Sequence, residues 1–320
     1  MKVFVAGASG ALGAQLVPQL AAAGHQVVAM TKTASKQDGL RALGARPVVA
    51  DALDPDAVAG VVGEAEPEVI LHQLTALSGP VSVRDARHPD RALATIMTIR
   101  LRTEATDHLL AAGRAVGARR FVAQSFAAFR FARTGGPVLT EADPLDPDPP
   151  AALRAGQEAM LYLEQAVTTI EWGEGLVLRY GSFYGPGTGI SLAPDAVMAA
   201  PIRKRRFPVI GDGGGVWSHV HIEDAAAATV AAVDHGQPGV YNIVDDDPAP
   251  VRVWLPELAS ALGAKSPRRI PRWLARLAAG ELATVMMTDV RGASNAKAKR
   301  ELGWHLRYPS WRLGFTKGLA

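Results

Sequence analysis

The chain has 320 residues, of which 48% are hydrophobic and 20% charged, and its formal net charge is +3. This composition is typical of a soluble globular protein and excludes a disordered or coiled-coil chain. The length suits one large α/β domain or two smaller domains. Because the sequence contains no cysteine, disulfides, thiolate metal ligands and cysteine nucleophiles are excluded.

Partners other than small molecules have little support in the sequence. No apolar run reaches the ~18 residues of a membrane span, and the N-terminus carries no secretory signal, so we expect a cytoplasmic protein. The histidines show no metal-binding spacing; His219 and His221 lie two residues apart, which suits a strand. The one dense basic run, 203–206, lacks interleaved aromatic residues and is interpreted as a solvated segment. We expect no metal and no nucleic-acid or membrane partner.

The first thirty residues predict a β-α-β unit. Val3–Ala6 is a short apolar run that ends at a glycine, and apolar residues then recur at helical spacing from Ala11. Gly24 would cap this helix, and His25–Met30 is predicted to be the second strand. Further strands, separated by Ala-rich helices, are predicted at Arg46–Ala50, Val69–Gln73, Arg120–Gln124 and Leu176–Tyr180. This alternation predicts an α/β fold with a Rossmann-type, doubly wound parallel sheet.

The second half of the chain is less regular. Residues 134–150 are rich in Pro, Asp and Gly and are predicted to form a surface loop. A strand is expected near Val220 and a helix from Asp224, whereas 248–320 is mainly helical. We therefore predict a dinucleotide-binding domain from residues 1–178 and 216–247. A smaller, C-terminal substrate lobe would comprise 179–215 and 248–320.

Three glycines at the start of the chain predict a dinucleotide site. Gly7, Gly10 and Gly13 follow a strand and open a helix. In this context the first glycine permits the tight turn, the second lets the backbone approach a pyrophosphate, and the third allows close packing of helix and strand.

The end of the second predicted strand favours NADP over NAD. An acidic residue there would bind the adenosine ribose of NAD, but the chain has Thr31 and Lys32. Lys32 and Lys36 are suited to a 2′-phosphate, although both would equally serve as exposed surface lysines. Asp51 follows the third strand, where it would bind the adenine amino group or cap the next helix.

The chain resembles the extended short-chain dehydrogenase/reductase family, the NAD(P)-dependent epimerase/dehydratase group. The resemblance is carried by the glycine motif and by the segments 51–53, 72–76, 179–186, 219–224 and 241–242, and it covers nearly the whole chain. It implies substrate binding between the sheet edge and the smaller lobe, and a homodimer formed through the helices near 95–115 and 153–167. The cofactor-binding residues that we predict are Gly7, Ser9, Gly10, Ala11, Leu12, Gly13, Thr31, Lys32, Asp51, Ala52, Leu53, Gln73, Leu74 and Thr75.

The proton-transfer residues of that family are missing from this chain. Family members act through a Ser or Thr and a Tyr-x-x-x-Lys pair, in which the lysine lowers the pKa of the tyrosine. No tyrosine here is followed by a lysine four positions on, and aligning Glu164 with the family places Gly156 and Met160 at the two positions. Of the usual paired serines, the second becomes Phe126. Ser125 and Tyr180 are the candidates to replace the missing groups.

The substrate is predicted to differ from a nucleotide sugar. At the place where sugar-nucleotide epimerases carry a diphosphate-binding arginine, this chain has Trp217, which would bind an aromatic or apolar substrate or simply pack in the core. The substrate-lining residues that we predict are Phe126, Tyr184, Trp217 and His219.

Two functions follow from these features. The first is an NAD(P)-dependent oxidoreductase, epimerase or dehydratase that acts on a small molecule other than a sugar nucleotide. Hydride transfer mainly needs alignment of cofactor and substrate, so loss of the phenol does not exclude it. The alternative is a non-catalytic NAD(P)-binding regulator or sensor.

Overall fold

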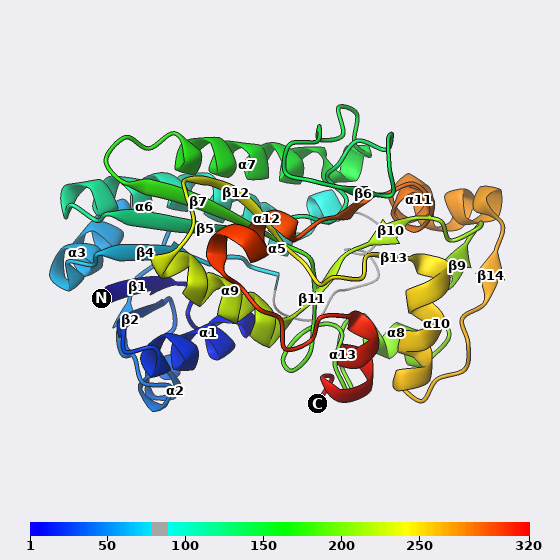
Figure 1. Cartoon of the computed structure of the whole chain (residues 1–320), viewed down its shortest axis with the longest axis horizontal. Helices are drawn as coiled ribbons and strands as arrows, with labels where there is room; N and C mark the ends of the chain where they lie inside the picture. The colour runs from blue at the N-terminus through cyan, green and yellow to red at the C-terminus, as the bar shows by residue number, and fades with distance from the viewer. Residues whose placement is uncertain (78–88) are drawn as a thin grey trace.

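A seven-stranded sheet forms the centre of the molecule, and the computed structural model describes residues 1–77 and 89–320 (Figure 1). The strand order is β12-β7-β5-β4-β1-β2-β3, and every neighbouring pair is parallel. The strands are β1 (Lys2–Ala6), β2 (Gln26–Thr31), β3 (Arg46–Val49), β4 (Val69–His72), β5 (Arg120–Phe126), β7 (Glu174–Tyr180) and β12 (Gly239–Ile243). The Rossmann-type doubly wound fold predicted from the sequence is confirmed.

The chain reverses its direction across the sheet between β1 and β4. It proceeds outward from β1 through β2 to β3, returns to β4 on the other side of β1, and then continues outward through β5 and β7 to β12. In open parallel sheets, ligands bind at such a switch point, outside the carboxyl ends of the strands.

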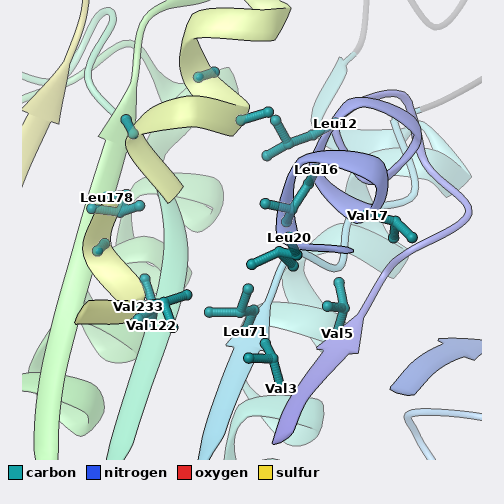
Figure 2. Packing of buried hydrophobic residues seen from close by; sticks show 14 of the residues in the cluster. Val3, Val5, Leu12, Leu16, Val17, Leu20, Leu71, Val122, Leu178 and Val233 are labelled. Carbon is teal, nitrogen blue, oxygen red and sulfur yellow. The ribbon is translucent and has the colours of Figure 1, made fainter. Parts of the chain in front are cut away.

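Helices cover both faces of the sheet (Figure 1). One face carries α1 (Ala11–Ala22) and α9 (Ile222–Asp234), which pack on each other. Figure 2 shows Leu16 and Leu20 of α1 directed at the apolar side chains of β1 and β4. The opposite face carries α3 (Pro55–Ala65), α5 (Leu93–Arg102), α6 (Glu104–Ala115) and α7 (Ala151–Thr168).

A smaller lobe lies beside the carboxyl edge of the sheet (Figure 1). Its apolar core contains the fully buried Trp254 and Trp311 and the nearly buried Trp217. Its elements are β8 (Ser182–Tyr184), α8 (Ala199–Arg203), β9 (Val209–Ile210), β10 (Val216–Trp217), β11 (His219–His221), β13 (Ala249–Pro250), α10 (Val251–Ala261), β14 (Arg269–Ile270), α11 (Arg272–Thr288) and α13 (Trp311–Lys317).

The structure differs from the sequence prediction in two local features. Residues 134–150 are not wholly irregular, because β6 (Val138–Leu139) pairs in parallel with β15 (Gly292–Ala293). The helix α12 (Ala296–Leu302) packs against the sheet side and contributes Leu302 to that core, although the predicted division assigned 248–320 to the smaller lobe. The division at those boundaries stays a prediction. No helix in the described part of the chain is long and apolar enough to cross a membrane.

Candidate active site

A cavity of about 1160 Å³ follows the carboxyl edge of the sheet and continues to the smaller lobe. Every residue predicted to bind the cofactor lines it, because parallel strands end at the same edge and their loops meet there. These residues come from the ends of β1, β2, β3 and β4 and from the start of α1. Their contacts with a dinucleotide stay a prediction.

The glycine loop has the geometry of a phosphate cradle. Gly7 has a φ of 94°, and a Cβ there would lie 2.6 Å from the carbonyl oxygen of Gln73. A Cβ at Gly13 would lie 2.1 Å from the carbonyl oxygen of Ala8, so α1 packs closely on the loop. The Cβ of a residue at Gly10 would meet only the Gly7 oxygen, at 3.4 Å. Gly10 therefore leaves the start of α1 open toward the cavity, where free backbone N–H groups bind an anion.

Replacement of Gly10 tests the cradle without disturbing the fold. We expect Gly10→Ala to weaken dinucleotide binding at least about tenfold, because the methyl group would stand where the pyrophosphate approaches the backbone. Calorimetric titration measures the affinity. Gly60→Ala is the matched control, since Gly60 lies within α3 with open space around it. An unchanged affinity in Gly10→Ala would show that phosphate does not bind at this loop.

The far end of the cavity carries two lysines and one carboxylate. Lys32 Nζ lies 2.7 Å from Asp51 Oδ2, and the hydrogen bond from Lys32 lowers the pKa of Asp51. The side chain of Lys32 is 68% exposed, so its ammonium is able to turn toward a ligand. Lys36 also lines the cavity there. The Thr31 hydroxyl donates to the Ser9 hydroxyl at 3.3 Å and so joins the end of β2 to the glycine loop.

Ser125 lies outside this cavity. Its side chain is fully buried, donates to Glu164 Oε1 at 2.6 Å and accepts from Arg130 Nη1 at 3.0 Å. Its neighbours Gln124 and Phe126 line the cavity instead, because successive side chains of a strand point to opposite faces. The geometry gives Ser125 a structural role and does not support the predicted contact with a substrate.

Tyr180 lines the cavity, but its hydroxyl is occupied. The residue is fully buried, and the hydroxyl forms a 2.7 Å hydrogen bond with that of Thr229 on α9. Burial raises the pKa of Tyr180, which makes the phenol a weaker acid. The arrangement does not support Tyr180 as a replacement for the missing proton donor.

Of the four predicted substrate residues, only Phe126 lines the cavity. Tyr184, Trp217 and His219 pack together in the core of the smaller lobe. Trp217 donates its indole N–H to the carbonyl of Met286 at 2.8 Å, and burial lowers the pKa of His219 to about 3. A direct role for these three residues is not supported, because no ligand in the cavity would reach their buried rings.

Aromatic and small side chains shape the end of the cavity near β5. Phe126 and Phe129 stack edge to face with their centroids 5.9 Å apart, and both line the cavity. Phe129 has a φ of 64°, a left-handed conformation that is costly for a bulky residue and fixes the direction of this loop. Across the cavity, α7 contributes Gly156 and Met160, and a Cβ at Gly156 would meet no atom within 4 Å. Open space therefore lies beside Gly156, the position that the sequence comparison with the family assigns to its tyrosine.

A buried ionic network supports this end of the cavity. Arg179 donates from Nε and Nη2 to both oxygens of Glu164, at 3.0 and 2.7 Å, and Arg130 pairs with the same carboxylate. Burial raises the pKa of Glu164, but the hydrogen bonds and charges of the two arginines lower it further, to about 2. Sequence reasoning used Glu164 only as an alignment point and missed its ion pairs with Arg130 and Arg179; the signal available was Arg179, a charged residue inside an apolar strand.

Comparison with known proteins gives consistent matches. The family model described as the NAD dependent epimerase/dehydratase family matches residues 3–244. A Streptomyces protein named 3-diazoavenalumate denitrifying reductase is 46% identical over 318 residues, which cover 99% of this chain and 100% of that protein. A 2-alkyl-3-oxoalkanoate reductase of Stenotrophomonas maltophilia is 28% identical, over 82% of this chain and 76% of its own length.

Solved structures share the fold. The UDP-glucose 4-epimerase of Thermus thermophilus in complex with NAD has a TM-score of 0.72 and 23% identity, covering 100% of this chain and 98% of that one. A human epimerase family protein with NADPH has a TM-score of 0.73 and 18% identity, covering 100% and 99%. At these identities the likeness concerns the fold alone.

Proposed function

The chain belongs to the NAD-dependent epimerase/dehydratase family, and from this premise we propose that it is an NAD(P)H-dependent reductase that replaces the diazo group of a small aromatic compound with hydrogen. The broader statement, an NAD(P)-dependent enzyme acting on a substrate other than a sugar nucleotide, follows from the family and from a full-length relative that is a named reductase. The alternative of a non-catalytic dinucleotide sensor has no counterpart among these named relatives.

One observation carries the proposal: the cavity combines a dinucleotide cradle with open space where the proton-donating pair of the family would lie. The sequence comparison assigns Gly156 and Met160 to the two positions, both residues line the cavity, and Tyr180 is engaged with Thr229. Among the described lining residues there is no histidine, and the lysines, Lys32 and Lys36, lie at the far end. Among the described lining residues, the two positions assigned to the family pair therefore hold no group that donates a proton to a hydride acceptor.

When the diazo group is carried as an aromatic diazonium cation, its replacement by hydride needs no proton donor, because the cation and the hydride together give the arene and dinitrogen. A bound reduced nicotinamide supplies a hydride and becomes oxidised. The ring carbon of the substrate gains a C–H bond, its C–N bond breaks, and the electron pair of that bond leaves with dinitrogen. The protein has to bind the ring, align its carbon and exclude water, and Phe126, Phe129 and Met160 provide an apolar surface for these tasks.

Carbonyl reduction is the competing activity, as the name of the Stenotrophomonas relative illustrates. It would require a proton for the developing alkoxide, a contribution of about 10²- to 10⁴-fold in rate. The raised pKa and the bonded hydroxyl of Tyr180 argue against that chemistry here. The 46% identity with the denitrifying reductase over the whole chain favours the diazo substrate.

Isotope transfer tests the proposed reaction. The purified protein is incubated with 3-diazoavenalumate and with NADPH or NADH carrying deuterium at C4 of the nicotinamide. We expect dinitrogen release and deuterium at ring carbon 3, and no label there when unlabelled cofactor is used in D₂O. Reactions without protein correct for spontaneous reduction. Reduction of 3-oxoalkanoates by a protein that leaves the diazo compound intact would overturn the proposal.

We propose NADPH as the preferred cofactor because the end of β2 carries Thr31 and Lys32 and no carboxylate, with Lys36 nearby. The double variant Lys32→Ala/Lys36→Ala is expected to weaken NADPH binding about 10-fold or more and NADH binding much less, since each charged contact to a phosphate contributes ~1.5 kcal/mol or more. Fluorescence titration with both cofactors measures the ratio. An equal loss for both cofactors would place the lysines elsewhere than at a 2′-phosphate.

The predicted homodimer is retained as part of this proposal. Exposed apolar side chains lie on α5 and α7, the helices that the resemblance assigns to the interface: Leu93, Ile96, Leu161 and Tyr162. Sedimentation velocity measures the assembly, and a monomer at micromolar concentration would contradict this expectation.

A further inference from the structure

Three arginines surround one carboxylate beside the cavity. Arg130 and Arg179 both pair with Glu164. Arg102 lies close enough to this pair that the charge of Arg130 lowers the pKa of Arg102 and the charge of Glu164 raises the pKa of Arg102. In the described part of the chain no other carboxylate lies within ion-pair distance of these guanidinium groups. The cluster therefore carries more positive than negative charge in a region shielded from water.

Arg102 is the member of the cluster that pairs with no carboxylate among the residues that the structure describes. It ends α5, is 9% exposed, and donates no hydrogen bond to any residue that the structure describes. Burial lowers its pKa to about 10, so the side chain is still charged at neutral pH. A buried charge without a partner is costly, and a bound ligand of opposite charge would compensate that cost.

The position of Arg102 indicates which ligand it would meet. Along the carboxyl edge of the sheet the cavity runs from β3 and β2, with Lys32, past the glycine loop after β1, to β4 and β5. Arg102 lines the cavity at the ends of β4 and β5: the carbonyl oxygen of its neighbour Leu101 lies 3.2 Å from Nε2 of His72, the last residue of β4, and the charges of Arg130 and Glu164 act on Arg102 from the side of β5. Arg130, Phe126 and Phe129 line the same cavity. The phosphates of a dinucleotide belong to the glycine loop and the Lys32 end, so the anion near Arg102 belongs to the other bound molecule.

We propose that Arg102, supported by Arg130, binds the carboxylate of an aromatic acid substrate whose ring lies against Phe126 and Phe129. This inference rests on the proposed function, because it names the class of molecule that the reductase takes. Planar guanidinium groups match carboxylates in geometry, and edge-to-face aromatic walls match a flat ring. The second arginine is fixed by Glu164, which keeps its Nη atoms bonded and leaves its Nε unpartnered.

Binding of an unreactive acid tests the subsite directly. Calorimetry with 4-hydroxycinnamate and its methyl ester, in the presence of saturating NADP⁺, compares a carboxylate with an uncharged analogue. We expect the unaltered protein to prefer the acid by about 10-fold or more, and Arg102→Met to weaken acid binding by about 10- to 100-fold while leaving the ester unchanged. Arg102→Lys keeps the charge and should retain part of the preference.

Two controls separate recognition from folding. Arg114→Met removes an exposed arginine on α6 that does not line the cavity, and we expect no change in either affinity. Thermal unfolding of Arg102→Met without ligand should give an equal or higher Tm, because the substitution removes a buried unpaired charge and keeps a side chain of similar length. A structural arginine would instead lower the Tm.

Several results would overturn the subsite. The first is that the unaltered protein does not bind the acid. The second is that Arg102→Met leaves the ratio of acid affinity to ester affinity unchanged. The third is that Arg102→Met loses affinity for NADPH while this ratio is preserved, which would assign Arg102 to the cofactor. The two proposals fail separately. If the protein binds the acid but does not reduce the diazo compound, the proposed reaction is wrong and the subsite stands. If it reduces a diazo acid and its ester equally well, the subsite is wrong and the reaction stands.

Discussion

Replacement of Glu164 by glutamine is expected to destabilise the protein by about 3–5 kcal/mol. The substitution leaves the paired guanidinium groups of Arg130 and Arg179 buried without a negative charge, and turns an amide N–H₂ toward one of them. For a chain of this length the loss corresponds to a fall in Tm of roughly 5–7 °C. Differential scanning calorimetry and urea unfolding at neutral pH measure it.

The acid limb of the stability curve gives an independent check on the same residue. The pKa of Glu164 is lowered to about 2 in the folded protein from an ordinary value of 4.5. Its contribution is therefore complete above the unfolded-state value and is lost as the pH falls from about 4.5 toward 2, where the unfolded chain binds the proton more readily. The stability difference between the unaltered protein and Glu164→Gln should narrow over that range.

The matched control for Glu164 is Glu104. Glu104 pairs with Arg100 on the surface, at 2.7 Å, with both side chains nearly half exposed. Glu104→Gln should leave the stability unchanged, because exposed ion pairs contribute little. A loss in Glu164→Gln no larger than in Glu104→Gln would mean that the buried network is not stabilising the loop of Arg130.

Replacement of Gly156 by tyrosine should lower kcat/KM for an aromatic diazo substrate about 100-fold or more. The phenol would fill the open space beside Met160 in which we expect the substrate ring, and a displacement of the ring by ~1 Å is enough for an effect of this size. Helix α7 itself accommodates the substitution, since no atom lies within 4 Å of the added Cβ. Steady-state kinetics with reduced cofactor provides the measurement.

Two companion variants identify the cause of that loss. Gly156→Phe fills the same space without a hydroxyl and should lose the same activity. Gly156→Tyr/Met160→Lys restores the family pair and should reduce ketones at least about 100-fold faster than Gly156→Phe does. Full diazo activity in Gly156→Tyr would show that the substrate does not enter the space next to α7.

That the predicted cofactor residues lie together at one edge of the sheet was predictable, because local chain order determines it. A strand, a glycine turn and a helix specify the loop at Gly7, and the ends of parallel strands must meet at one edge. Asp51 and Gln73 were predicted from their places after predicted strands and from the family resemblance, without knowledge of any side-chain contact. All of the predicted cofactor residues accordingly line one cavity.

The substrate half was not predictable, because it depends on side-chain direction and on packing between distant segments. Successive side chains of β5 point to opposite faces of the sheet, so Ser125 points to the ionic network and Phe126 points into the cavity. Tyr184 and His219 follow the same edge in sequence, yet the helices of the smaller lobe cover them. Arg102 is one of two arginines at the end of α5, and only the fold shows that it is buried whereas Arg100 is exposed.

The buried carboxylate of Asp224 links helix α9 to the last residues of the chain to be translated. It lies at the start of α9, which packs on α1 and on β5 and β7 of the sheet, and accepts hydrogen bonds from the backbone N–H groups of Arg307 and Tyr308 at 2.7 and 2.8 Å. The indole of Trp304 reaches the carbonyl of the same aspartate at 3.0 Å. A nascent chain on the ribosome lacks these partners until translation has passed residue 308. The dinucleotide-binding half, although encoded first, therefore reaches its final packing only when nearly the whole chain has been made.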